Sequence, residues 1–145
     1  MLLPDVNVLI YAHREDSHAE HSRFADWITR LATGPEPFAL SVLALVGLVR
    51  IVTNPRIFQR PSTLEEALAF ADELTSRPTA FLVGPGPKHW ELVGELCRAA
   101  KATAKLVADA QHAAIAIEHG CTLVTTDSDF GRFPHLRWRH PLAAL

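Results

Sequence analysis

The chain has 145 residues, a length that suits one domain with a buried core, and a content of 48% hydrophobic and 21% charged residues excludes a disordered protein. No apolar stretch approaches the ~20 residues of a membrane span, and no basic segment precedes a long apolar run, so we expect neither a membrane anchor nor a signal peptide. The net charge of −2 gives no general attraction for nucleic acid, and Cys97 and Cys121 are expected to be buried thiols in a reducing, cytoplasmic setting.

The first half of the chain alternates short apolar runs with segments of helical periodicity. Phe24, Trp27, Ile28 and Leu31 follow the i, i+3, i+4, i+7 spacing of an amphipathic helix, and Ser41 has the side chain of a helix N-cap. We therefore predict strands at residues 1–4 and 38–40, and helices at 6–13, 17–31, 41–53 and from 62 or 63 to just before Arg77-Pro78.

The second half continues the same alternation. It predicts a strand at 80–83, a turn at 84–87, helices at 88–102 and 106–119 with Gly120 ending the latter, and strands at 122–125 and 136–139. Strands that alternate with helices favour a parallel sheet. The expected fold is a single α/β domain over residues 1–145, a three-layer α/β/α structure with a short, mainly parallel central sheet.

Two aspartates stand where apolar runs stop. Asp5 follows the first predicted strand, and Asp127 follows the strand that ends near Thr125. If these strands are parallel neighbours, the two carboxylates meet at the carboxyl edge of the sheet, where ligands bind in open α/β folds. Crowded carboxylates repel each other unless a cation lies between them, so the pattern predicts a divalent-metal site.

A third acid, Asp109, lies beside the small-residue stripe of an otherwise apolar helix. A buried carboxylate needs a partner, and Lys105, four residues before it, is the only local candidate. Asp109 is therefore either an ion-pair partner of Lys105 or of a distant Arg, a residue placed to interact with the helix dipole, or a third metal ligand. Considered with Asp5 and Asp127, it is best interpreted as a ligand.

Three segments carry a resemblance to a known family. They are Leu3-Pro4-Asp5-Val6-Asn7-Val8-Leu9, the helix that begins Asp109-Ala110 and runs to Gly120, and Leu123-Val124-Thr125-Thr126-Asp127 with Asp129, Phe130 and Phe133. Together they resemble the PIN-domain family, and most of all the toxins of bacterial VapBC toxin–antitoxin modules. The likeness runs over nearly the whole chain and extends to the tail from Phe133 to Pro141.

The resemblance implies a magnesium- or manganese-dependent endoribonuclease that serves as a type II toxin. Asp5, Asp109 and Asp127 would be its catalytic metal ligands and Asp129 an auxiliary acid, a set of oxygen donors that suits a hard cation. Such a cation activates water and holds oxygens at phosphorus. Asn7, Thr125 and Thr126 would orient the ligands.

One departure from the family pattern lies in the helix that follows Ser41. The family usually supplies a further Glu there, but this chain has Gly47 near that position and no acid between Glu36 and Glu65. A glycine inside a helix costs about 1 kcal/mol relative to alanine, so Gly47 is expected to have a packing role. With one acid fewer, the centre would bind a second metal weakly, unless water or Asp129 fills the gap.

The arginines and one apolar helix face indicate partners. Arg is well shaped to bind phosphate, so the candidates for RNA contact are Arg50, Arg132, Arg137 and Arg139. The resemblance implies a cognate antitoxin and a homodimer. The apolar face of the helix that begins near Ser62 is expected either to contact one of these proteins or to be buried in the core; it comprises Leu64, Leu68, Phe70 and Leu74.

Two alternatives to an active nuclease stay open. The missing acid allows a catalytically weakened or inactive RNA-binding toxin or regulator. A metal-dependent phosphohydrolase acting on a small substrate would instead need a closed pocket, and the arginines make it less favoured.

Overall fold

The computed structural model describes residues 1–143, so residues 144 and 145 of the predicted domain lie outside the description. Within the described residues, five strands form one fully parallel sheet in the order β3-β2-β1-β4-β5. The strands are β1 (Leu2–Pro4), β2 (Phe38–Ser41), β3 (Ala80–Val83), β4 (Thr122–Val124) and β5 (Trp138–Arg139).

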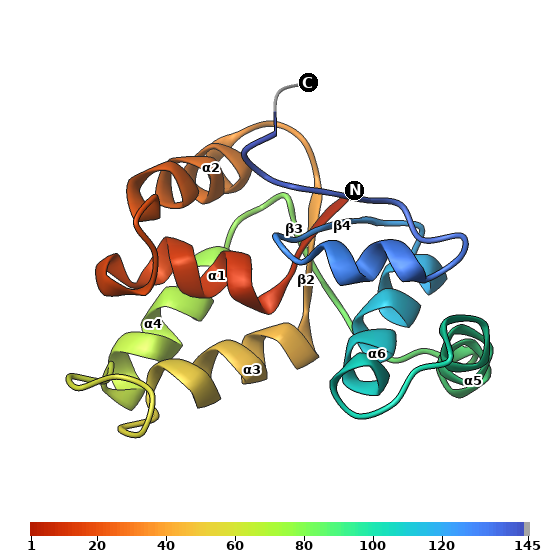
Figure 1. Ribbon diagram of the computed structural model, residues 1–145. Helices are drawn as coiled ribbons and strands as arrows, with labels where there is room; N and C mark the ends of the chain where they lie inside the picture. Colours follow the sequence, from red (N-terminus) through yellow and green to blue (C-terminus); the bar gives the residue numbers. More distant parts are fainter. Residues whose placement is uncertain (144–145) are drawn as a thin grey trace.

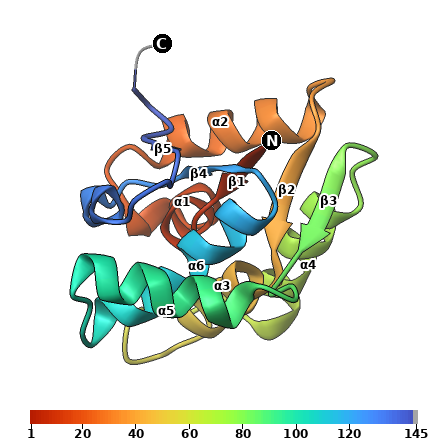
Figure 2. The same ribbon diagram turned by 90° about the vertical axis from the view of Figure 1, so that its right-hand side faces the viewer.

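Helices cover both faces of this sheet (Figures 1 and 2). One layer contains α1 (Val6–His13), α2 (His21–Thr33), α3 (Val42–Val52) and α4 (Leu64–Thr75), and the other contains α5 (His89–Ala100) and α6 (Lys105–Glu118). Two short 3-10 turns, η1 (Glu15–Ser17) and η2 (Ser128–Arg132), complete the elements. The predicted three-layer α/β/α fold is confirmed.

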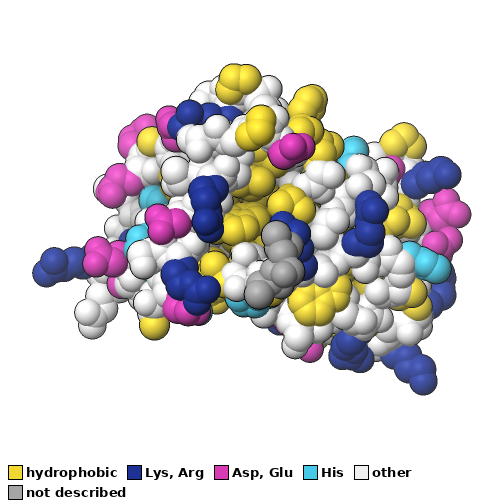
Figure 3. All heavy atoms as spheres, turned by 90° about the horizontal axis from the view of Figure 1, so that it is seen from above, with side chains coloured by type: hydrophobic (Ala, Val, Ile, Leu, Met, Phe, Trp, Pro, Cys, Tyr) yellow, Lys and Arg dark blue, Asp and Glu magenta, His cyan; other side chains and the backbone are white. Residues whose placement is uncertain are grey.

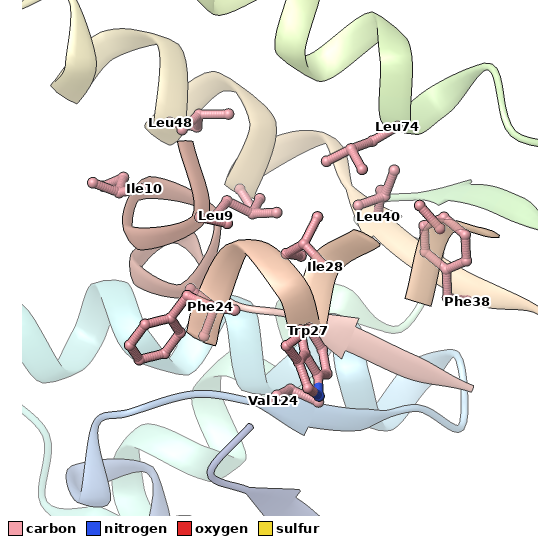
Figure 4. Close-up of a cluster of buried hydrophobic side chains, with 14 of the residues drawn as sticks. Leu9, Ile10, Phe24, Trp27, Ile28, Phe38, Leu40, Leu48, Leu74 and Val124 are labelled. Carbon is pink, nitrogen blue, oxygen red and sulfur yellow. The ribbon is translucent and has the colours of Figure 1, made fainter. Parts of the chain in front are cut away.

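Two apolar cores lie on opposite faces of the sheet because successive strand residues point to opposite sides. On β2, Phe38 and Leu40 pack under α1 to α4, whereas Ala39 between them packs with α5 and α6. The first core also takes in Trp27 and Val124 (Figure 4). A strand buried on both faces must be apolar throughout, which explains the unbroken apolar runs of the sequence.

The second predicted helix differs from the observed one at its start. The prediction placed residues 17–31 in a helix, but α2 begins at His21, and Ser17 belongs to η1. The Ser17 hydroxyl donates to the backbone carbonyls of Arg14 (2.6 Å) and Ile10 (3.3 Å) at the end of α1. His18 is extended, so the helix cannot run through it. Ser17 thus completes the preceding helix instead of capping the next one.

The last predicted strand is shorter than expected, because His135 has a φ of +67° and a turn precedes β5. The other boundaries agree within about two residues, the usual scatter at element ends. Within residues 1–143, no helix has the length and apolar character needed to cross a bilayer. Both cysteines are free thiols, Cys121 buried and Cys97 half-buried, and burial raises the pKa of the Cys121 thiol.

The apolar face of α4 divides between core and surface. Leu74 is buried and Phe70 packs against the first core, while Leu64 and Leu68 are exposed. The two exposed leucines are the part of this face that remains available to a partner.

Candidate active site

The sheet order brings the first two predicted acids together. β1 and β4 are parallel neighbours with Pro4 in register with Val124, and the N–H of Asp5 donates to the carbonyl of Val124 at 2.9 Å. Asp5 and Asp127 therefore leave the sheet at the same carboxyl edge, as the sequence predicts. This edge is formed by segments from opposite ends of the chain.

Thr125 joins these two aspartates. Its side-chain hydroxyl donates to Oδ2 of Asp5 at 2.7 Å, and the same oxygen accepts the N–H of Asp127 at 3.1 Å. Asp5 also caps α1 by accepting the N–H of Val6 on Oδ1 at 2.8 Å. Burial raises the pKa of Asp5, although the hydrogen bond from Thr125 opposes that shift. The orienting role predicted for Thr125 agrees with these contacts.

Asp109 and Asp127 both form ion pairs with the Lys105 side chain. The ammonium nitrogen of Lys105 lies 2.9 Å from Oδ2 of Asp109 and 3.0 Å from Oδ2 of Asp127. Burial acts to raise the pKa of Asp127, but the N–H of Asp129 and the Lys105 ammonium outweigh it and hold that pKa below its usual range. Asp109 thus forms the expected ion pair with Lys105 and also lies close to Asp127.

The donor chemistry of this centre fits a hard divalent cation, because its donors are carboxylate oxygens and two of them already converge on a positive charge. Across residues 1–143, however, no set of three or more His, Cys, Asp or Glu side chains is arranged as a ready-made metal site. The Lys105 ammonium contacts both Asp109 and Asp127, two of the carboxylates that would hold a metal ion. A metal would therefore have to displace it.

The acids line an open pocket of about 400 Å³ between α3 and α6. Its wall contains Asn7 and Arg50, both predicted, and also Lys105, Gln111 and His112, which the sequence did not assign to the site. Gln111 and His112 follow Asp109 directly and share its helix. The positive form of His112 acts to lower the pKa of Asp5.

Four of the other predicted residues lie away from this pocket. The Asp129 side chain is exposed, and its backbone N–H donates to Asp127 at 2.9 Å instead. Arg132 donates to the carbonyl of Ala100, and Arg137 to the carbonyl of Gly120, just before β4 begins. Thr126 is half-buried outside the pocket lining.

Arg139 lines a different cavity, of about 540 Å³, with Leu2 at the start of β1 and Trp27 of α2. This cavity is larger than the acidic pocket but contains none of the three aspartates. Figure 3 shows Lys and Arg side chains scattered among acidic and apolar ones on the face that is seen from above. Of the four predicted arginines, Arg50 alone lines the acidic pocket.

Gly47 has the packing role that the sequence predicts. A Cβ atom at this position would lie 3.3 Å from Cγ2 and 3.4 Å from Cγ1 of Val6, so α3 approaches α1 closely here. Gly47 also lines the acidic pocket. The wall formed by α3 consequently offers apolar atoms and Arg50 where the family pattern has a carboxylate.

Comparisons with known proteins agree with this geometry. The PIN domain profile matches residues 2–136. The chain is 42% identical to ribonuclease VapC43 of Mycobacterium tuberculosis over 98% of its own length and 96% of that protein, and 41% identical to ribonuclease VapC31 of the same species over 97% and 99%. A crystal structure of VapBC2 from Rickettsia felis bound to a promoter DNA fragment superposes with a TM-score of 0.69 and 22% identity, covering 96% of this chain and 97% of that one.

Proposed function

We propose, from the premise that this chain belongs to the PIN domain family and to its VapC-type members, that it is a toxin that cleaves RNA in the cytoplasm with the aid of a divalent metal. The observation that carries the proposal is the meeting of Asp5, Asp109 and Asp127 in one open pocket at the carboxyl edge of the sheet. An open pocket accepts a polymer, which argues against a small phosphate ester as the substrate.

Magnesium or manganese is the proposed cofactor. Asp5, Asp109 and Asp127 would hold the cation, which supplies charge stabilisation to phosphoryl oxygens when it is bound. Thr125 fixes the orientation of Asp5, and the N–H of Asp129 fixes that of Asp127. Hydrogen bonds from a hydroxyl and a backbone N–H thus orient two of the three carboxylates, and the third, Asp109, accepts one from the Lys105 ammonium.

Arg50, His112 and Gln111 are the proposed contacts to RNA, since they line the same pocket as the acids. Arg50 carries a permanent charge that a phosphate accepts in a bidentate geometry. Arg132 and Arg137 are engaged with backbone carbonyls at 3.2 and 2.8 Å and have structural roles in this arrangement.

Expression in a bacterial host tests the nuclease function. Asp109→Asn removes a charge from the pocket while keeping side-chain shape, so growth arrest and new RNA 5′ ends are expected to disappear. Asp26→Asn makes the same change on the exposed surface of α2 and is expected to leave both intact. Persistence of cleavage in Asp109→Asn would contradict the site. RNA binding by the wild type without any cleavage would favour the inactive regulator instead.

The antitoxin is proposed to bind the groove between α3 and α4. Leu45, Val46, Val49, Leu68 and Ala71 give it an apolar lining, and Val46 and Arg50 line both this groove and the acidic pocket. A protein segment in the groove therefore reaches the active site directly. The homodimer that the resemblance implies remains a prediction.

Co-expression with the cognate antitoxin tests this groove. Leu68→Asp places a charge in the apolar lining and is expected to abolish neutralisation of the toxin. Leu82→Asp makes the same change on β3, where the leucine is exposed but lies outside the groove, and is expected to be neutralised normally. Equal neutralisation of both variants would refute the assignment.

A further inference from the structure

Lys105 holds two of the three acids in the candidate active site. Its ammonium lies 2.9 Å from Asp109 and 3.0 Å from Asp127, although 70% of the Lys105 side chain is exposed. Its carboxylate partners are only 13% and 22% exposed. The exposed Lys105 side chain thus covers two largely buried carboxylates, and its ion pairs connect α6 to the segment after β4.

The local backbone does not favour a lysine at this position. Lys105 is the first residue of α6, where a positive charge opposes the helix dipole, and no side chain caps this helix. The preceding residue, Ala104, has a φ of +52° and a ψ of −123°, a conformation that residues other than glycine rarely adopt. The favourable contacts that Lys105 makes at this position are those with Asp109 and Asp127.

We propose that Lys105 is a positioning residue that acts as a built-in counter-ion: its ammonium neutralises Asp109 and Asp127 until a divalent cation binds and displaces it. The proposal rests on the metal-dependent function proposed above. The ammonium contacts Oδ2 of Asp109 and of Asp127, and the same two carboxylates would hold the divalent cation, so the two positive charges would compete for them. Lys105 therefore weakens metal binding while stabilising the metal-free protein.

Manganese binding to the full chain, measured by calorimetry, tests this competition. Lys105→Met keeps the length and apolar stem of the side chain but removes its charge. We expect it to bind Mn²⁺ about tenfold more tightly than the wild type, the combined effect of two partly exposed ion pairs. Its melting temperature without metal is expected to fall, whereas the melting temperature with saturating Mn²⁺ should match that of the wild type.

Two further variants complete the comparison. Lys105→Arg retains the charge and is expected to bind Mn²⁺ about as the wild type does. Lys101→Met removes an exposed lysine four residues earlier that makes no ion pair within residues 1–143, and is expected to behave as the wild type in both measurements. These variants separate the effect of the charge at position 105 from a general loss of positive charge.

A chemical-labelling experiment on the wild type gives an independent measurement that needs no substitution. Acetylation of Lys105 by a lysine-directed reagent, followed by mass spectrometry, should become faster when Mn²⁺ is added, because the ammonium is released from the carboxylates. Lys101 is the internal reference and should react at an unchanged rate.

The outcomes distinguish the two proposals. Equal or weaker Mn²⁺ affinity in Lys105→Met, or a raised KM for RNA with unchanged Mn²⁺ affinity, would overturn the counter-ion role and leave the nuclease function standing. An absence of Mn²⁺ binding in every variant, together with cleavage in a chelator, would overturn the metal-dependent function as well.

Discussion

At the scale of single residues, Thr125 is the side chain on which the acidic centre most depends. It is fully buried, and its one oxygen contacts Asp5 and the backbone of Asp127. Thr125→Val removes that oxygen at nearly constant shape, so the buried Asp5 loses a donor. We expect the free energy of unfolding to fall by about 1–3 kcal/mol and the RNA cleavage rate to fall about 10–100-fold. Chemical denaturation and a cleavage assay measure the two effects.

Thr125→Ser is the matched control, because it removes the methyl group and keeps the hydroxyl. It is expected to cleave RNA at nearly the wild-type rate. If the serine variant lost as much cleavage as the valine variant, packing of the methyl group rather than the hydrogen bonds would explain the effect.

Two substitutions of Gly47 test whether the absence of an acid in α3 limits metal binding. Gly47→Glu and Gly47→Gln crowd Val6 equally, but only the first adds a charge to the pocket. We expect Gly47→Glu to bind Mn²⁺ about tenfold more tightly than Gly47→Gln, since affinity rises with the number of charged ligands. Calorimetry on both variants provides the comparison, and equal affinities would show that a carboxylate here does not reach the metal.

The acids were predictable from the sequence and most of the arginines were not, for a physical reason. Asp5 and Asp127 end strands, and parallel strands end at a common edge, so their meeting follows from the fold class. Arg137 precedes the short edge strand β5 and Arg139 lies in it, and the sequence does not show toward which end of the sheet their long side chains reach. Lys105 was recognisable as a neighbour of Asp109, but its contact with Asp127 depends on tertiary structure.

At the scale of elements, a polar contact joins α1 to the residues that lead into α4. The buried Ser62 hydroxyl lies 3.0 Å from Nε2 of His13 and accepts a hydrogen bond from Arg14 at 3.1 Å. The His13 ring also packs against Phe70 of α4. These contacts fix the position of α4, and with it one wall of the apolar groove.

This contact predicts a pH dependence of stability. Burial, together with the charge of Arg14, lowers the pKa of His13 below 6.5, although Glu66 opposes the shift. The unfolded chain therefore binds a proton more readily than the folded one, so the contribution of His13 to stability is complete above about pH 6.5 and is lost as the pH falls below it. His13→Gln is expected to show a smaller loss of stability than the wild type between about pH 7 and pH 5 in denaturant titrations.

His135→Asn is the control for this measurement, because His135 is exposed and asparagine accepts its positive φ. It should reproduce the wild-type pH dependence. A wild-type curve that matches His13→Gln would show that protonation of another group causes the loss.

The elements themselves were largely predictable, since hydrophobic periodicity and capping residues are local signals. Ser41 and Thr63 cap α3 and α4 as their side chains predict. Ser17 was misleading because the same hydroxyl can accept an N–H at the start of a helix that follows or donate to the carbonyls at the end of one that precedes, and the sequence does not distinguish these roles.

At the scale of the whole molecule, the two cores share one sheet, and its central strand comes from the start of the chain. β1 lies between β2 and β4, so the sheet takes strands from both halves of the chain and neither half forms it alone. We expect a single unfolding transition, with tryptophan fluorescence from Trp27 and Trp138 coinciding with far-UV circular dichroism. Two separated transitions would show that the two cores do not unfold as one cooperative unit.

Phe38→Ala, a substitution inside the first core, also tests whether the molecule unfolds in one transition. Phe38 is fully buried on β2, and its truncation is expected to cost about 3–5 kcal/mol while shifting both signals together. Phe81→Ala is the matched control, because Phe81 on β3 is 52% exposed, and its truncation should change stability by about 0.5 kcal/mol or less.

The central position of β1 has a consequence for the synthesis of the protein. Asp5 is made well before its neighbours in the pocket, because Asp109 and Asp127 follow it by more than a hundred residues. A polypeptide that stops before Asp109, whether still growing on the ribosome or truncated by a broken message, carries one carboxylate of the three and lacks β4, one of the two strands that pair with β1. Under the proposed nuclease function such a fragment lacks two of the three carboxylates, so RNA cleavage is expected only after Asp127 has been made and β4 has paired with β1.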